Sequence, residues 1–86
     1  MTAFALRAVV LQLLQERAGQ WVALDQLQAL TAQPLHRVEH VCAQLVFLGD
    51  AHTASVGHFT YFGTRVEGVA PPQIQTPTPS LQRTDP

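Results

Sequence analysis

The sequence predicts a mainly helical α+β domain in which three helices are followed by a β-hairpin. Three segments carry apolar residues at spacings of three and four, the period of a helix with one buried face. After Asp50 the spacing shortens towards two, which is typical of strands. A chain of 86 residues, 47% of them hydrophobic, is long enough for one core of this kind but short for two.

The segment from Thr2 to Ala18 is predicted to form the first helix. It contains no proline or glycine, Thr2 can cap its first turn, and Gly19 readily takes the left-handed conformation that ends helices. Its apolar residues fall on two lines: Leu6, Val9, Val10 and Leu13 share one face with Arg17, while Phe4, Leu11 and Ala18 form the second. One buried face cannot absorb both lines. We therefore expect a symmetric homodimer through this helix, and coverage by the C-terminal segment is the alternative.

A shorter second helix is predicted where Leu24, Leu27 and Leu30 recur every three residues. Asp25 lies in its first turn, near the positive end of the helix dipole. Residues 31–33 are expected to form a turn. Pro34 suits the first position of a third helix, because its missing N–H would be unpaired there anyway.

The third helix is predicted to run from Pro34 until Gly49 ends it. Its inward apolar positions are Val38, Val41, Cys42, Leu45 and Leu48. The polar residues expected on its other side are Gln33, His36, Arg37, His40 and Gln44. Cys42 is the only cysteine, so no internal disulfide can form, and we expect a buried, inert thiol.

A hairpin is predicted from two β-prone stretches, Ala51–Ala54 and His58–Phe62, joined by the connector Ser55–Gly57. A short extended piece at Trp21 and Val22 can pair with it as a third strand. The aromatic residues Trp21, Phe59, Tyr61 and Phe62 follow the sheet. They are expected in the core or an interface rather than on a base-stacking platform.

The composition changes near Glu67, because five of the six prolines lie beyond it among Gln, Thr and Ser. The stretch PPQIQTPTPS has too few large apolar residues to offset the entropy of ordering it. We therefore predict a folded domain over residues 1–67 and a Pro-rich, disordered tail over residues 68–86. A solvated end is the expected role of the tail, and a ligand for an aromatic groove is the alternative.

Charge and motif content exclude several classes of function. The net charge is −1 with no lysine, so the chain does not coat nucleic acid and any DNA contact is local. There is no nucleophile with a base, no paired carboxylates and no phosphate loop, so we expect neither an enzyme nor a cofactor. His36 and His40 have the spacing of metal ligands but lack a third ligand, so no metal site is expected. Without a membrane span or export signal, the expected location is the cytoplasm, with no membrane partner.

The stretch LDQLQALTAQPLHRVEHVCAQLVFLGDA, followed by a hairpin ending in TYFG, resembles the winged helix-turn-helix of bacterial transcription regulators with the IclR- and MarR-like pattern. The resemblance covers about residues 24–63. Pro34 falls at the proline of the pattern, and Leu48 with Gly49 falls at its Leu-Gly stop. The sequence departs from the pattern where Ala32 replaces the turn glycine, Gln33 a half-buried Leu, Ala23 the capping Thr or Ser, and Leu35 a residue that is often polar.

The resemblance implies a sequence-specific regulator that binds double-stranded DNA as a small dimer, with the third helix in the major groove. In that groove Arg37 can donate two hydrogen bonds to guanine. The candidate DNA contacts are Gln33, His36, Arg37, His40, Gln44 and Arg65. Hairpin residues that could meet phosphate or the minor groove are His52, Thr53, Ser55 and His58.

Winged helices also serve as protein–protein interaction modules that bind no DNA, and this alternative stays open. Such a module would hold its partner through Leu35, Val46, Phe47 and the surplus face of the first helix. The complete absence of lysine favours it.

Overall fold

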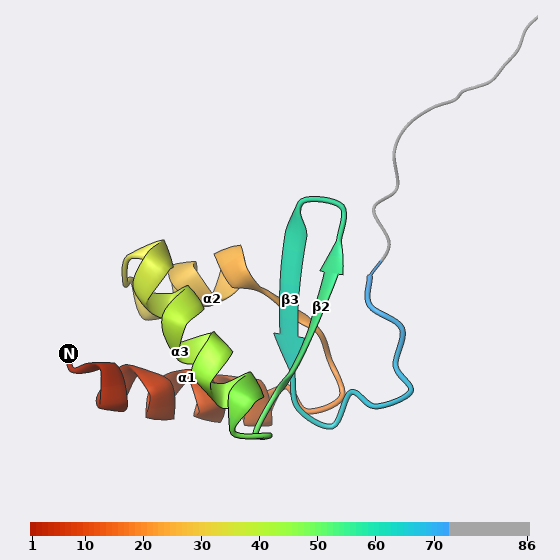
Figure 1. Cartoon of the computed structure of the whole chain (residues 1–86), viewed down its shortest axis with the longest axis horizontal. Helices are drawn as coiled ribbons and strands as arrows, with labels where there is room; N and C mark the ends of the chain where they lie inside the picture. The colour runs from red at the N-terminus through yellow and green to blue at the C-terminus, as the bar shows by residue number, and fades with distance from the viewer. Residues whose placement is uncertain (73–86) are drawn as a thin grey trace, which may run out of the picture.

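The structure is a computed structural model, and it describes residues 1–72 of the chain. Within that range the fold is α+β, with three helices and one antiparallel sheet of three strands (Figure 1). The elements in chain order are α1 (Ala3–Glu16), β1 (Val22–Ala23), α2 (Leu24–Thr31), α3 (Leu35–Phe47), β2 (His52–Val56) and β3 (Phe59–Gly63). The predicted class and order of elements are confirmed. Disorder was predicted for residues 68–86. Of these, residues 73–86 lie outside the described residues.

Helix α1 begins as the sequence predicts and ends two residues earlier than predicted. The Thr2 Oγ1 accepts a hydrogen bond of 3.0 Å from the Ala5 N–H, which caps the first turn. At the other end, the backbone of Arg17 leaves the helical region, with φ −113° and ψ 34°. Gly19 then takes the expected left-handed conformation, with φ +84°, and its N–H donates to the Thr64 carbonyl at 2.8 Å. The chain turns early because this contact ties it to the end of the sheet.

The buried face of α1 consists of Leu6, Val10 and Leu14, spaced four residues apart and all 0% exposed. The predicted face was therefore incomplete at its C-terminal end, because it omitted the fully buried Leu14, while Leu13 is half-buried and packs against the core. In the second apolar line, Leu11 packs against the protein's own core. The surplus that suggested a dimer is smaller than expected, and its large exposed member is Phe4, at 73% exposure.

The residues that cap α2 and begin α3 include three positions singled out in the sequence, Ala23, Ala32 and Pro34. Ala23 occupies the N-cap of α2 and makes no side-chain capping bond. Ala32 ends the helix in the left-handed conformation, at φ 55° and ψ 32°, which glycine adopts more easily. Pro34 is the N-cap of α3 rather than its first helical residue, because its ψ of 143° is extended. Its carbonyl instead accepts the N–H of Arg37 at 3.0 Å.

The inward face of α3 is confirmed except at its end. Val38, Val41, Cys42 and Leu45 are buried, but Leu48, predicted to be inward, is 55% exposed. The helix ends at Phe47, and the chain turns away from the core at Gly49, whose φ is +82°. Leu30, the last residue of the apolar recurrence that predicted the second helix, is exposed at the end of α2.

The sheet has the order β1-β3-β2, so the extended piece after α1 does pair as a third strand. In the register, Val22 lies opposite Phe62 and Val56 lies opposite Phe59. Residues 57–58 therefore form the hairpin turn, and the predicted connector Ser55–Gly57 was wrong. Gly57, with φ +62°, supplies the positive φ that a two-residue turn requires, which moves the turn towards the C-terminus.

The aromatic residues of the sheet region have different environments. Phe62 is buried and Trp21 half-buried, whereas Phe59 is largely exposed near the hairpin turn. The Trp21 Nε1–H donates to the Val69 carbonyl at 2.9 Å, which holds the chain after Glu67 against the end of β1. In the part of the chain that the structure describes, no helix is long and apolar enough to cross a membrane.

Candidate nucleic-acid interface

The face of α3 opposite its buried residues consists of His36, His40, Ala43 and Phe47, which we call the outer stripe. Their spacings of four, three and four place them on one side of a helix, and all four are exposed. Phe47 is 89% exposed, more than any other large hydrophobic residue among residues 1–72. The outer stripe is therefore polar in its first half and apolar in its second.

Arg37 lies on the flank of α3 beside the N-terminus of α1. Its Nη1 donates a hydrogen bond of 2.9 Å to the Met1 carbonyl, and the side chain is otherwise exposed. This bond uses one of the five N–H donors of the guanidinium, so a bidentate contact with guanine has to use the remaining donors or displace the Met1 carbonyl. A solvent-exposed hydrogen bond contributes little net free energy, so the contact is a modest obstacle.

The two glutamines are less accessible than the histidines. Gln33 precedes α3 in the turn and is half-buried, as is Gln44. The Gln44 Nε2 lies 3.4 Å from the His40 Nε2, so these side chains adjoin one another along the helix. His36, Arg37 and His40 therefore belong to the first turns of α3, with Gln33 just before the helix and Gln44 one turn further on.

The tip of the hairpin lies beside the first turns of α3. A shallow hollow of about 200 Å³ separates them, lined on the helix side by Leu35 and Glu39 and on the hairpin side by His58, Phe59 and Thr60. The start of α2, from Ala23 to Asp25, completes its wall. The helix and the hairpin can thus meet one partner together, but the carboxylates of Asp25 and Glu39 line the gap between them.

Arg65 is not part of this group. It lines a second hollow of about 540 Å³, which also contains Gln15 and Ala18 from the end of α1 and Gly49 and Asp50 from the end of α3. A helix of 13 residues is about 18 Å long, so Arg65 lies roughly that far from the residues at the start of α3. The structure therefore separates one candidate DNA contact from the other five.

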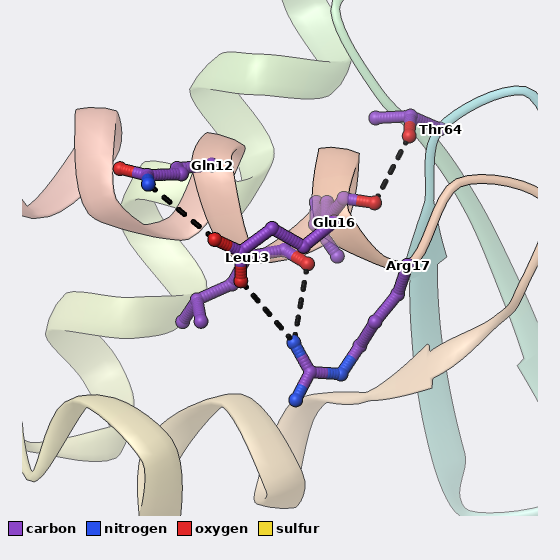
Figure 2. Close-up of polar contacts among 6 residues, drawn as sticks. Gln12, Leu13, Glu16, Arg17 and Thr64 are labelled. Carbon is purple, nitrogen blue, oxygen red and sulfur yellow. Dashed lines mark hydrogen bonds and ion pairs between the residues drawn. The ribbon is translucent and has the colours of Figure 1, made fainter.

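Figure 2 shows the bond that ties the end of α1 to the end of the sheet, together with contacts among the last residues of α1 itself. The Thr64 hydroxyl donates to the Leu14 carbonyl at 3.1 Å. The Arg17 Nη1 lies 3.4 Å from the Leu13 carbonyl and 4.0 Å from the Glu16 Oε1, and Gln12 also donates to Glu16. Arg17 is therefore engaged by neighbouring residues of α1, and the bond from Thr64 holds α1, on which α3 packs, to the end of the sheet.

The arginines among residues 1–72 are largely engaged within the chain. Besides Arg17 and Arg37, the Arg7 guanidinium stands 5.4 Å from the centre of the Phe4 ring. Arg65 is exposed in the second hollow. Any phosphate contact through Arg7, Arg17 or Arg37 must therefore compete with an intramolecular partner.

Cys42 is buried, as predicted, on the inner face of α3. Burial raises the pKa of its thiol to about 12, and the nearby charge of Glu39 acts in the same direction. A thiol in this state supplies no thiolate at neutral pH, so it offers neither a nucleophile nor a soft metal ligand. No group of three or more His, Cys, Asp or Glu residues within residues 1–72 could hold a metal ion.

Two features of the site have no signal in the sequence. The contact between Arg37 and Met1 joins residues 36 positions apart, and His58 reaches the hollow beside Leu35 only because the hairpin folds back on α2.

No family model, curated protein or solved structure matches the chain.

Proposed function

We propose that the protein is a winged-helix transcription regulator that binds double-stranded DNA as a dimer. In this proposal the first turns of α3 enter the major groove and the hairpin contacts the flanking backbone. The observation that carries it is the position of the hairpin tip, with His58, beside the start of α3 at Leu35 and Glu39. A groove-reading helix and a wing need this adjacency, because both must reach the same stretch of DNA.

The roles of the candidate contacts follow from their side chains and exposure. Arg37 is the base-reading residue, since its guanidinium can pair with the O6 and N7 of guanine. His36 and His40 donate to bases or phosphates from the outer stripe, and Gln33 can pair with adenine from the turn. Arg65, at the other end of α3, serves at most as a distant backbone contact.

Dimerisation is required by the low charge. Residues 1–67 hold four arginines against five acidic residues, so a single chain makes few phosphate contacts and gives a shallow dependence of affinity on salt. Two copies double those contacts and place two recognition helices about 34 Å apart on a palindrome. Phe4, exposed at the start of α1, is the residue through which we propose the copies meet.

The test compares the binding of genomic DNA fragments by the wild-type protein and two variants that lose the same charge. Arg37→Ala should weaken binding by about 1–3 kcal/mol at the preferred sites and relax sequence preference at one base pair. Arg65→Ala should leave the sequence preference unchanged. If Arg37→Ala binds every sequence as well as wild type does, base reading through α3 is wrong.

A second candidate is a protein-interaction module of the same fold. It is favoured by the exposure of Phe47 and by the carboxylates of Asp25 and Glu39 beside the start of α3, which repel phosphate. In this function the apolar half of the outer stripe contacts the partner. Absence of DNA binding by the wild-type protein, at low salt and on every fragment, would favour this candidate over the first.

A further inference from the structure

The outer stripe of α3 carries two histidines in the geometry of a metal chelate. His36 and His40 are one helical turn apart on the same exposed face, which puts their Cβ atoms about 5–6 Å from one another. Both lie within α3, next to the buried residues Val38 and Val41 that fix the helix on the core. The helix thus holds the two imidazoles in place at little further cost in backbone entropy.

Neither imidazole is strongly engaged. The contact of His40 is a solvent-exposed one with Gln44, at 3.4 Å, and among residues 1–72 His36 makes no hydrogen bond or ion pair. Side-chain rotation can therefore bring one nitrogen of each ring to the distance of about 2.0–2.1 Å that a zinc ion requires.

One copy of the chain supplies only two of the ligands that such a metal site needs. Zinc in a structural site takes four ligands in a tetrahedron, and no third His, Cys, Asp or Glu within residues 1–72 joins the pair. Glu39 lines the hollow next to the hairpin, and Cys42 is buried on the opposite side of α3. A second copy related by two-fold symmetry would add the two missing nitrogens, because the same surface faces itself in such a dimer.

We propose that His36 and His40 bind a divalent transition metal, with zinc as the reference ion, together with the same two residues of a second copy. In this dimer the two α3 helices lie side by side and parallel, so each residue of the outer stripe meets its own equivalent. Ala43, in the middle of the stripe, is small enough to let the helices approach. Phe47 then packs against the other Phe47, which covers the most exposed large apolar side chain among residues 1–72.

This dimer differs from the metal-independent one proposed through Phe4, and it does not depend on DNA binding. If both proposals hold, zinc and DNA compete, because His36 and His40 cannot face a second copy and a DNA groove at once. The metal would then act as a release signal for the regulator.

The test uses the full chain, stripped of metal by a chelator and titrated with zinc chloride. Calorimetry should give one zinc ion per two chains, and sedimentation should show an added association step that the chelator reverses. Cobalt in place of zinc should give the visible absorption of a tetrahedral site. His36→Ala and His40→Ala should each weaken zinc binding at least about tenfold, because even outer partners of a metal site are worth about 10–100-fold.

The matched controls are His52→Ala and His58→Ala, which remove exposed histidines of the hairpin that lie outside the outer stripe. Both should keep zinc binding and the zinc-dependent association. Phe47→Ser should weaken the association while circular dichroism stays unchanged, since the side chain is exposed. The proposal is overturned if zinc does not bind, if it binds one ion per monomer, or if the hairpin variants lose as much affinity as the α3 variants.

Discussion

The left-handed conformation of Ala32 makes a specific prediction about stability. Ala32 ends α2 at φ 55° and ψ 32°, and its N–H donates to the Gln28 carbonyl at 2.8 Å. For a residue with a Cβ this conformation costs about 1–2 kcal/mol, whereas glycine adopts it freely. Glycine loses about 0.5–1 kcal/mol more in conformational entropy on folding. Ala32→Gly should therefore stabilise the protein by about 0.5–1 kcal/mol.

The chain supplies a control with the same chemical change. Ala29 is exposed in the interior of α2, where glycine costs about 1 kcal/mol relative to alanine. Thermal unfolding followed by circular dichroism should give a melting temperature about 2–8 °C higher for Ala32→Gly, because 1 kcal/mol corresponds to about 4–8 °C in a domain of this size. Ala29→Gly should melt at a lower temperature than wild type. If both variants lower the melting temperature, the turn does not hold Ala32 in the left-handed region.

Three further predictions concern the core and its polar contacts. Leu14→Ala should cost about 2–5 kcal/mol in urea unfolding, because Leu14 is fully buried, whereas Leu30→Ala on an exposed position should cost much less. Thr64→Val should cost about 0.5–1.5 kcal/mol by removing a buried hydrogen bond to the Leu14 carbonyl, which keeps only the Arg17 N–H as a donor. Thr53→Val, at an exposed hydroxyl, should be nearly neutral, and equal losses would contradict the role of the buried bond. The pKa of Cys42 is raised from 9.0 to about 12 in the folded state, so its contribution to stability is complete below pH 9 and is lost as the pH rises towards 12. Between pH 8 and pH 10 the wild type should lose about 1 kcal/mol more than Cys42→Val, and parallel pH profiles would contradict this burial effect.

Features of the fold that depend on neighbouring residues could be predicted from the sequence. The cap at Thr2, the glycine turn at Gly49 and the buried residues Val38 and Leu45 each follow from local geometry or from a helical period. They are confirmed because helix boundaries and buried faces depend mainly on residues within one or two turns.

The errors occur where distant parts of the chain decide the outcome. Leu13 and Leu14 lie on neighbouring positions of α1, and the packing of α3 and the bond from Thr64 decide that Leu14 is the buried one. The hairpin turn lies later than predicted because β2 pairs with β3 as far as Val56 opposite Phe59. Arg65 follows the hairpin in sequence, but the returning strand places it at the far end of α3.

Three substitutions in α3 distinguish DNA binding, zinc binding and the binding of another protein. Arg37 lies on the flank, outside the outer stripe, so Arg37→Ala should impair DNA reading and leave zinc binding intact. Phe47 lies about 16 Å along the helix from His36, beyond the proposed base contacts, so Phe47→Ser should impair the zinc-linked dimer and leave DNA reading intact. His36→Ala should impair both, since the imidazole is proposed to serve in each. A protein whose α3 binds only another protein would instead lose its partner with Phe47→Ser and respond neither to zinc nor to Arg37→Ala.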